Sequence, residues 1–550
     1  MESRRGSEAL PWLATVMLLL AAPAVHAQGE EQPAAEEEPA ADEEQPPAEA
    51  REAGEVTPEP KAEAEAEDEA SEEPAGRVIR GEGDEGGGSG AAAAATGDGL
   101  PRRSDERRRA TETDDGGLSV VDILENFQFG SYGRVSAGSD LEGGTGRQVR
   151  LVAHPPRLLE GPYAEIDLSY RHEVQKTGTK FQTQVTLALG EKLFHFTGDF
   201  EADIAIRNLY LEVQDVFVEG LSVWAGSRMY RGDDVYLLDF WPLDEQNTVG
   251  GGVGYCFGHT DLRLHLGMNR LEDRFQTQTI VVPGEVLGTR EVLFMDRQRT
   301  VVSLRAEHHF NLSGEWKLKG ALYGESHTLA AGTYRTADRD DEKLPADVGW
   351  LGGLELGTYG FADSSYANLF VRFASGLAAY DELGIPFGLD REKKAEGARE
   401  LMLGLSANYE PGGVAGLLLG VYGRYFVDAD PNVYDRDDAW ELALAFRPAW
   451  FVTEHFHLIA EVNLQYLRPN GLSPESGEQE TPLAFEFGLM PSLSLGKGSY
   501  ARPQLRLIYA MTWLNDAALL TYAPEDPLRD RQLRHFLGLS VEWWFHSSRY

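Results

Sequence analysis

Apolar and polar residues alternate one by one along most of the chain from Asp122 onward. In residues 163–171 the odd positions are mostly polar or ionisable, whereas the even positions are Ala, Ile, Leu and Tyr. Residues 262–269, 400–410 and 458–467 repeat the pattern. Because successive side chains of a β-strand point to opposite faces, a period of two predicts strands with one apolar and one polar face.

The number and length of these segments favour a membrane barrel over a soluble sandwich, whose strands also alternate. About 18 segments fit between Phe127 and Phe545, many of them about nine to twelve residues long. About nine to eleven tilted residues span the hydrocarbon core, whereas ordinary strands average about five or six. Strands in lipid must pair all their backbone groups, so they cross a membrane only as a closed barrel. The sequence therefore predicts an all-β fold, a transmembrane antiparallel β-barrel of about 18 strands.

The N-terminus has the three parts of a secretory signal peptide. Arg4 and Arg5 precede an apolar stretch at residues 10–24, and Val25-His26-Ala27 offers a cleavage site with a small final residue. The apolar stretch is too short to span a bilayer and an acidic run follows it. We therefore expect residues 1–27 to direct export, and we expect the mature protein in the outer membrane of a Gram-negative cell.

Residues 28–117 lack the apolar residues that a folded domain needs. Glu, Ala and Pro dominate the first part, and Gly and Ala dominate residues 81–99. Such a segment cannot bury enough apolar surface to offset its ordering entropy. We expect a disordered periplasmic extension, either a solvated linker or a tether that touches the cell wall, followed by the barrel at residues 118–550.

Charge and cysteine content exclude several other classes of protein. The formal net charge of −40 opposes nucleic-acid binding, which needs a basic surface. The single cysteine, Cys256, excludes an internal disulfide framework. His455 and His457 would share one face of a strand, but no regularly spaced carboxylate or cysteine completes a set of metal ligands. We expect no metal, no cofactor and no enzymatic activity.

Aromatic residues fall among charged residues on the face expected to line the lumen. Tyr132 and Arg134 share this face in the first segment, Tyr163 and Glu165 share it in the next, and Trp544 lies on it in the last. One interpretation is that these rings pack against a loop folded into the barrel. The other is a sugar track, because pyranose rings stack on aromatic rings while their hydroxyls bond to charged neighbours.

Several motifs resemble maltoporin and its sucrose-porin relatives. Gly130-Ser131-Tyr132-Gly133-Arg134 and Tyr163-Ala164-Glu165 are similar to the family's opening strands. Trp224-Ala225-Gly226-Ser227-Arg228-Met229-Tyr230, followed by Asp234-Val235 and Asp239-Phe240, is the most specific match. Ser499-Tyr500-Ala501-Arg502-Pro503 and Val541-Glu542-Trp543-Trp544-Phe545 agree as well.

The resemblance implies a homotrimer of 18-stranded barrels, each with a third loop that folds inward and an aromatic slide beside a polar track. Tyr132, Tyr163 and Trp544 match slide positions. The polar-track positions are Arg134, Glu165 and Asp239, with Arg157 and Arg207 as further matches. Trp241 stands where the family has a constriction tyrosine.

Three positions depart from the family pattern. Gly232 aligns with the family's constriction arginine, and Arg231 lies one place earlier. Alternation puts Arg207 in the apolar register of its segment. Trp440 shares a face with Leu442 and Leu444, which predicts a residue of the interfacial girdle rather than of the slide.

These features together predict a sugar-selective, passive channel that carries maltodextrins or similar oligosaccharides. A pore of the same scaffold for another solute, such as an organic anion, is one alternative. A barrel that only anchors an acidic cell-wall-binding arm is the other. The expected partners are outer-membrane lipid, two further copies of the chain, an oligosaccharide and the cell wall.

Overall fold

The computed structural model describes residues 126–546, apart from residues 191–192, 195–197, 199–202, 285–286, 339, 363 and 433–434. The expected signal peptide at 1–27 and the expected extension at 28–117 lie outside the described residues. Within the part that is described, no helix is long and apolar enough to cross a membrane.

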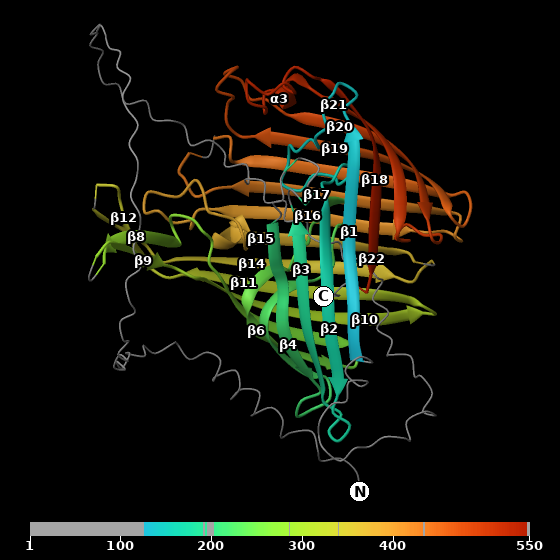
Figure 1. Ribbon diagram of the computed structural model, residues 1–550, viewed down its shortest axis with the longest axis horizontal. Coiled ribbons are helices and arrows are strands. Elements are labelled where there is room, and N and C mark those ends of the chain that lie inside the picture. Colours follow the sequence, from blue (N-terminus) through green and yellow to red (C-terminus); the bar gives the residue numbers. More distant parts are fainter. Residues whose placement is uncertain are drawn as a thin grey trace, which may run out of the picture. The chain divides into compact units, whose positions relative to one another are not determined.

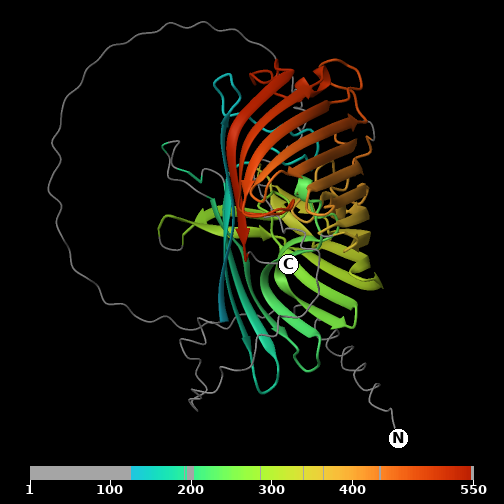
Figure 2. The ribbon, with the colours of Figure 1, turned by 90° about the vertical axis from the view of Figure 1, so that its right-hand side faces the viewer.

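Eighteen antiparallel strands form one closed sheet (Figures 1 and 2). Each strand pairs with the next barrel strand along the chain, and β1 pairs with β22 to close the cylinder. The first nine strands are β1 (Phe127–Ser139), β2 (Tyr163–Glu173), β3 (Lys180–Gly190), β4 (Asp203–Gln214), β5 (Leu221–Arg231), β6 (Glu245–Phe257), β7 (Thr260–Asn269), β10 (Arg299–Ser313) and β11 (Trp316–Leu329). The others are β14 (Asp347–Tyr359), β15 (Tyr366–Gly376), β16 (Arg399–Tyr409), β17 (Ala415–Val427), β18 (Ala439–Phe451), β19 (Phe456–Pro469), β20 (Leu483–Ser494), β21 (Gln504–Leu514) and β22 (Leu533–Phe545). The predicted all-β fold, an antiparallel barrel of about 18 strands, is confirmed.

The connecting segments contain the remaining elements. Two small hairpins extend from the barrel, β8 (Thr277–Pro283) with β9 (Thr289–Asp296) and β12 (Gly332–Arg335) with β13 (Asp341–Leu344). Short helical turns are η2 (Tyr236–Leu238), η3 (Leu377–Tyr380) and α3 (Asp516–Leu519).

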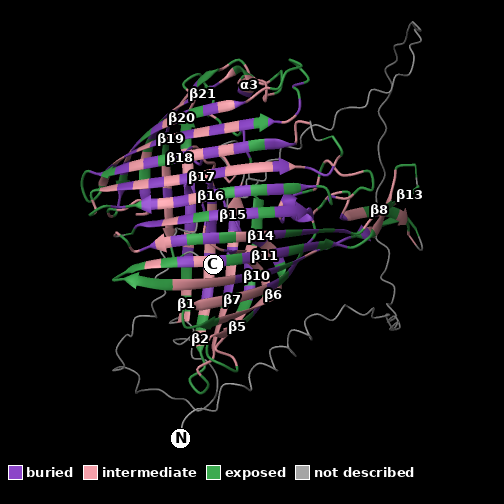
Figure 3. Cartoon of the chain, turned by 180° about the vertical axis from the view of Figure 1, so that it is seen from behind, coloured by how far each residue is buried: buried purple, intermediate pink, exposed green. Residues whose placement is uncertain are grey.

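Burial alternates along the barrel strands as the sequence predicts (Figure 3). In β16 the odd-numbered residues such as Leu401 and Leu403 are exposed on the outside, while Glu400 and Met402 are buried on the inside. The outer face is thus an apolar surface suited to lipid, and the inner face carries most of the polar side chains.

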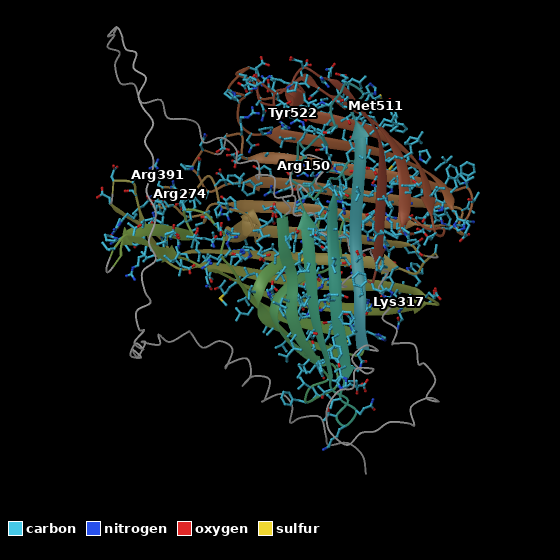
Figure 4. The ribbon with its side chains drawn as sticks, in the orientation of Figure 1. Arg150, Arg274, Lys317, Arg391, Met511 and Tyr522 are labelled. Carbon is cyan, nitrogen blue, oxygen red and sulfur yellow. The ribbon has the colours of Figure 1, made fainter. Side chains whose placement is uncertain are left out.

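The two rims of the barrel differ in the length of their connections. The connections that follow β1, β5, β7, β11, β15, β17, β19 and β21 are long, whereas most of those that follow the alternate strands are tight turns. Arg274 and Arg391 lie on the long-loop rim, and Lys317 follows a turn at the opposite rim (Figure 4).

Three long loops fold into the lumen instead of standing above it. The β5–β6 loop (residues 232–244) reaches the distant wall, where Leu237 and Val235 contact Gly420 of β17 and Leu243 contacts Gly353 of β14. A glycine in a strand interior often marks such a close approach. The β1–β2 loop (140–162) packs Leu158 against Gly488 of β20.

The β15–β16 loop (377–398) contacts another part of the wall, at β6 and β10. The Glu382 carboxylate accepts the backbone N–H of Asn247, and the Arg299 guanidinium donates to the backbone oxygens of Asp381, Glu382 and Gly384. These loops and the wall from β11 to β21 enclose an apolar core inside the barrel. Its members include Val149, Leu151, Val235, Leu237, Phe240, Leu243, Phe370, Leu377, Met402, Leu418 and Tyr422.

Candidate functional site

Three aromatic side chains from adjacent strands meet on the inner wall. Tyr132 of β1 lies opposite Trp544 of β22, and Tyr163 of β2 lies opposite Arg134 of β1. The rings of Tyr132 and Tyr163 are 6.0 Å apart, and they form a small apolar cluster with Ala188, against which Trp544 packs. The structure therefore brings together the three residues that the sequence singled out as a slide.

The two tyrosines of this cluster are almost fully covered. Tyr132 is 1% exposed and donates its hydroxyl to Glu542, 3.3 Å away. Tyr163 is 5% exposed and donates its hydroxyl to Glu165, 2.6 Å away. Trp544 is more accessible, and the Arg502 guanidinium lies 4.2 Å from its ring. The ring of Trp544 is thus the most open aromatic surface of the three.

Arg207 joins this cluster because β4 contains a bulge. The register between β3 and β4 shifts so that Thr186 faces Asn208 while Leu187 faces Ile206, which leaves Arg207 as the extra residue. A bulge changes which side chains face inward beyond it. The Arg207 guanidinium consequently pairs with Glu165 and donates to the Tyr163 hydroxyl. The apolar register predicted for Arg207 is wrong for this reason.

A second chain of ion pairs links the wall to the β5–β6 loop. Arg134 pairs with Glu160 at 3.0 Å, Arg157 pairs with the same carboxylate, and Arg157 also reaches Asp239 at 3.0 Å. The Arg134 guanidinium lies 5.4 Å from the Tyr163 ring centre, which connects both sets of charges. Six of the predicted site residues therefore form one network with Tyr132 and Trp544: Arg134, Arg157, Tyr163, Glu165, Arg207 and Asp239.

The β5–β6 loop is held by local structure as well as by ion pairs. Val235 and Phe240 form an isolated β-bridge around η2, and Asp239 adopts a left-handed backbone conformation with φ of 49°. Burial raises the pKa of Asp239 to about 6, although the Arg157 guanidinium opposes that shift. Burial likewise raises the pKa of Asp234 to about 7, and the Asp239 charge adds to the effect. Both carboxyl groups lie in the loop, outside the strands.

Trp241 lies apart from the aromatic cluster. It is 3% exposed and sits under the guanidinium of Arg231, 3.9 Å from its ring centre, and Arg231 pairs with Glu245 of β6. Trp241 is thus held against Arg231, whose charge also acts on Asp239 of the network.

The space beside Gly232 is taken by a charged pair from elsewhere in the chain. A side chain at this position would collide with the carboxylate of Asp244 and with the guanidinium of Arg305. Asp244 accepts the Gly232 N–H at 2.8 Å and pairs with Arg305 at 2.9 Å. Arg305 of β10 thus supplies a cationic group next to the residue that aligns with the family's constriction arginine.

Sequence reasoning missed several residues of the network. Glu160 of the β1–β2 loop pairs with Arg134 of β1 and with Arg157 of the same loop. Glu542 of β22 pairs with Arg502 and Arg506. Arg502, from the turn between β20 and β21, also donates to the Tyr236 hydroxyl at 2.7 Å. Alternation places Glu542 on the inner face, but residues in loops have no periodicity that could reveal them.

Two further predictions concern residues outside the network. Trp440 is 49% exposed on the outer face and stacks on Tyr425, so its expected outward position is confirmed. His455 lies in the turn before β19 and bonds to the Ser494 backbone oxygen, so it does not share a strand face with His457. Among the described residues, Asp428, Asp430 and Asp435 bring three carboxylates together in the β17–β18 loop, and we assign no ion to them.

The sequence matches the family of LamB porins over residues 127–545. The chain belongs to the LamB porin family. This porin is therefore a passive channel of the outer membrane, and its matched region coincides with the barrel from the first residue of β1 to the last residue of β22. Short turns face the periplasm in such barrels and long loops face outward.

Solved structures of other outer-membrane proteins resemble the porin at low identity. OccAB1 from Acinetobacter baumannii is 9% identical, with 76% of this chain and 97% of that chain covered at a TM-score of 0.40. A BenF-like porin from Pseudomonas fluorescens is 12% identical, with coverages of 77% and 99% and a TM-score of 0.38. OccK2 (OpdF) from Pseudomonas aeruginosa, solved in complex with glucuronate, is 13% identical, with coverages of 77% and 99% and a TM-score of 0.37.

Proposed function

We propose that this porin selects neutral carbohydrates, and that it carries maltodextrins or similar oligosaccharides down their concentration gradient. The observation that carries the proposal is the meeting of Tyr132, Tyr163 and Trp544 on three adjacent strands beside two chains of ion pairs. Aromatic faces bind the C–H faces of sugar rings, and charged groups bind the hydroxyls. We further propose that three copies assemble, as the family resemblance implies.

The pairing of the charges supports a neutral solute over an anion. Arg134, Arg157 and Arg207 each lie against a carboxylate, as does Arg502 beside Trp544. An anion would have to compete with these carboxylates for the guanidinium groups. A sugar hydroxyl can donate to the carboxylate and accept from the arginine, so it exchanges partners without breaking the charge balance.

Trp544 is the residue of the cluster that we expect a sugar to contact most readily. Its ring is the most accessible of the three, and Arg502 and Glu542 lie beside it. The two tyrosines bind through their hydroxyls to Glu542 and Glu165, so a sugar reaches them only by displacing those bonds. Weak and exchangeable contacts of this kind let a solute leave as readily as it arrives.

Replacement of Trp544 tests the proposal directly. We expect maltotriose to reduce the current through the purified porin in a planar bilayer, and Trp544→Ala to weaken this block several-fold. Loss of one stacked ring removes on the order of 1 kcal/mol of binding. Trp440→Ala is the matched control, because it removes the same side chain from the outer face. A wild-type current that maltotriose and sucrose leave unchanged would rule out sugar selectivity.

The two alternatives give different results in the same apparatus. A channel for organic anions would be blocked by glucuronate rather than by maltotriose. An envelope anchor would lose its association with the cell wall when residues 28–117 are removed, whereas a sugar channel keeps its conductance.

A further inference from the structure

A pocket opens at the long-loop rim, away from the aromatic cluster. It lies between residues 140–147 of the β1–β2 loop and residues 525–536, which end the β21–β22 connection and begin β22. We call this space the mouth pocket. Its volume of about 670 Å³ lies within the usual range of small-molecule sites.

Ion pairs between the two loops hold the mouth pocket in shape. Arg147 pairs with both carboxylate oxygens of Asp526, at 2.5 and 2.7 Å. Arg531 pairs with Asp140 at 3.2 Å and with Glu142 at 2.9 Å. These ion pairs each join a residue of the β1–β2 loop to a residue of the β21–β22 connection, so the two walls of the pocket are linked.

Arg534, near the start of β22, holds the β21–β22 connection in place. Its guanidinium donates to the backbone oxygens of Leu528 and Arg531 and to the hydroxyl of Tyr522, whose ring it also contacts at 4.4 Å. Tyr522 lies at the rim of the barrel in Figure 4. Because Arg534 is committed to the loop, it shapes the pocket, while Arg147 and Arg531 remain partly exposed to a ligand.

The floor of the mouth pocket is apolar. Phe536 and Leu159 lie there, and the Phe536 ring rests against Gly138, Gly538 and Gly146. A side chain at any of these glycines would collide with the ring. Phe536 therefore forms a fixed aromatic platform, of which only a small part is exposed, since the residue is 8% exposed.

The mouth pocket and the aromatic cluster lie near opposite ends of the inner face of β22. Phe536 and Trp544 share the inner face of β22 and are eight residues apart, a span of about 27 Å along a strand. Only the small residues Gly538 and Ser540 and the paired Glu542 lie between them on that face. The β1–β2 loop lies beside this stretch, because Ser136 of β1, opposite Ser540, donates to the Glu160 backbone oxygen and Leu158 packs in one cluster with Phe536.

We propose that the mouth pocket is a carbohydrate subsite that captures neutral oligosaccharides from outside and passes them to the cluster around Trp544. Arginines and carboxylates paired with one another suit hydroxyl groups, and the apolar floor suits the face of a sugar ring. The subsite rests on the proposed function and deepens it, because it assigns the capture step to residues at the rim.

Filling the pocket tests the proposal. Thr145 lines it and is exposed, so Thr145→Trp adds bulk there without removing a charged contact. We expect the association rate of maltotriose, added on the long-loop side and measured from current fluctuations, to fall about tenfold. The dissociation rate, which reports the inner cluster, should stay within about twofold. Phe536→Ala should lower the association rate as well, because it removes the platform.

Ala337→Trp is the matched control, since Ala337 is exposed on the β12–β13 hairpin at the same rim and outside the pocket. Heat-modifiable mobility on electrophoresis reports that each variant is folded. If wild-type current is blocked but Thr145→Trp behaves like Ala337→Trp, the subsite is wrong and the sugar channel stands. If Thr145→Trp slows glucuronate and not maltotriose, the pocket binds anions and the proposal is overturned. If maltotriose never blocks the wild type, the proposed function fails and the subsite with it.

Discussion

Asp234 and Asp239 place two ionisable carboxyl groups in the loop that crosses the lumen. Burial is the main cause of their raised pKa values, about 7 and about 6, and burial raises the pKa of Asp244 in the same loop to about 6 against the pull of Arg305. A carboxyl group is protonated below its pKa. All three groups therefore change from mostly charged to mostly neutral between pH 8 and pH 5, while the neighbouring arginines keep their charge.

This titration should alter the ion selectivity of the channel. As the pH falls from 8 to 5, loss of up to three negative charges should lower the preference for cations over anions. Reversal potentials in a KCl gradient measure the change. Asp234→Asn combined with Asp239→Asn should show a smaller change. Its selectivity at pH 8 should lie between the wild-type values at pH 8 and pH 5, because Asp244 is still charged. Glu478→Gln, in an exposed loop, is the control. An unaltered pH dependence in the double variant would contradict the assignment.

At the scale of the elements, several barrel strands have a glycine where the β5–β6 loop packs against their inner face. Gly420 on β17 admits Leu237 and Val235 of the β5–β6 loop, whose side-chain carbons would lie 3.1 and 3.2 Å from an added Cβ. Gly353 and Gly404 admit Leu243 and Pro242 of the same loop in the same way. The position of the loop across the lumen thus depends on missing side chains in the wall as much as on its ion pairs.

Filling one of these gaps should move the loop. Gly420→Leu forces a branched side chain against Leu237 and Val235, which we expect to destabilise the barrel by about 1–3 kcal/mol and to change the single-channel conductance. Gly423→Leu is the matched control, because Gly423 lies on the outer face of the same strand with open space around it. Thermal unfolding followed by heat-modifiable mobility gives the stability. Equal effects from both substitutions would show that stability and conductance do not depend on the contact between Gly420 and the loop.

At the scale of the whole molecule, the barrel closes without the N-terminal residues. β1 starts at Phe127 and pairs with both β2 and β22, so every barrel strand has two neighbours within residues 127–545. A closed sheet leaves no unpaired edge for residues 28–117 to complete. The extension should therefore be dispensable for conduction.

Deleting residues 28–117 behind the intact signal peptide tests this independence. We expect the conductance and the block by maltotriose to remain within about twofold of wild type, since neither depends on the extension. Cell fractionation after the deletion then reports whether the extension holds the cell wall. A shortened chain that reaches the outer membrane but conducts no ions would show that the barrel requires the extension.

The sequence alone determined that the chain forms a barrel of about 18 strands and which side chains face inward where the alternation is regular. Tyr132, Tyr163, Glu165 and Trp544 were placed correctly because alternation is a property of neighbouring residues in the chain. It also gave the outward position of Trp440. Alternation could not predict the bulge at Arg207, because an extra residue in one strand is defined only by the register of the strand beside it.

Only the tertiary structure decided what the inward loops do. The pairing of Arg157 with Asp239, the collision that keeps a side chain from Gly232, and the ion pairs that close the mouth pocket all join residues far apart in the chain. Such contacts arise when the cylinder closes and brings distant loops into one confined space. A local pattern of apolar and polar residues carries no information about which of those loops will meet.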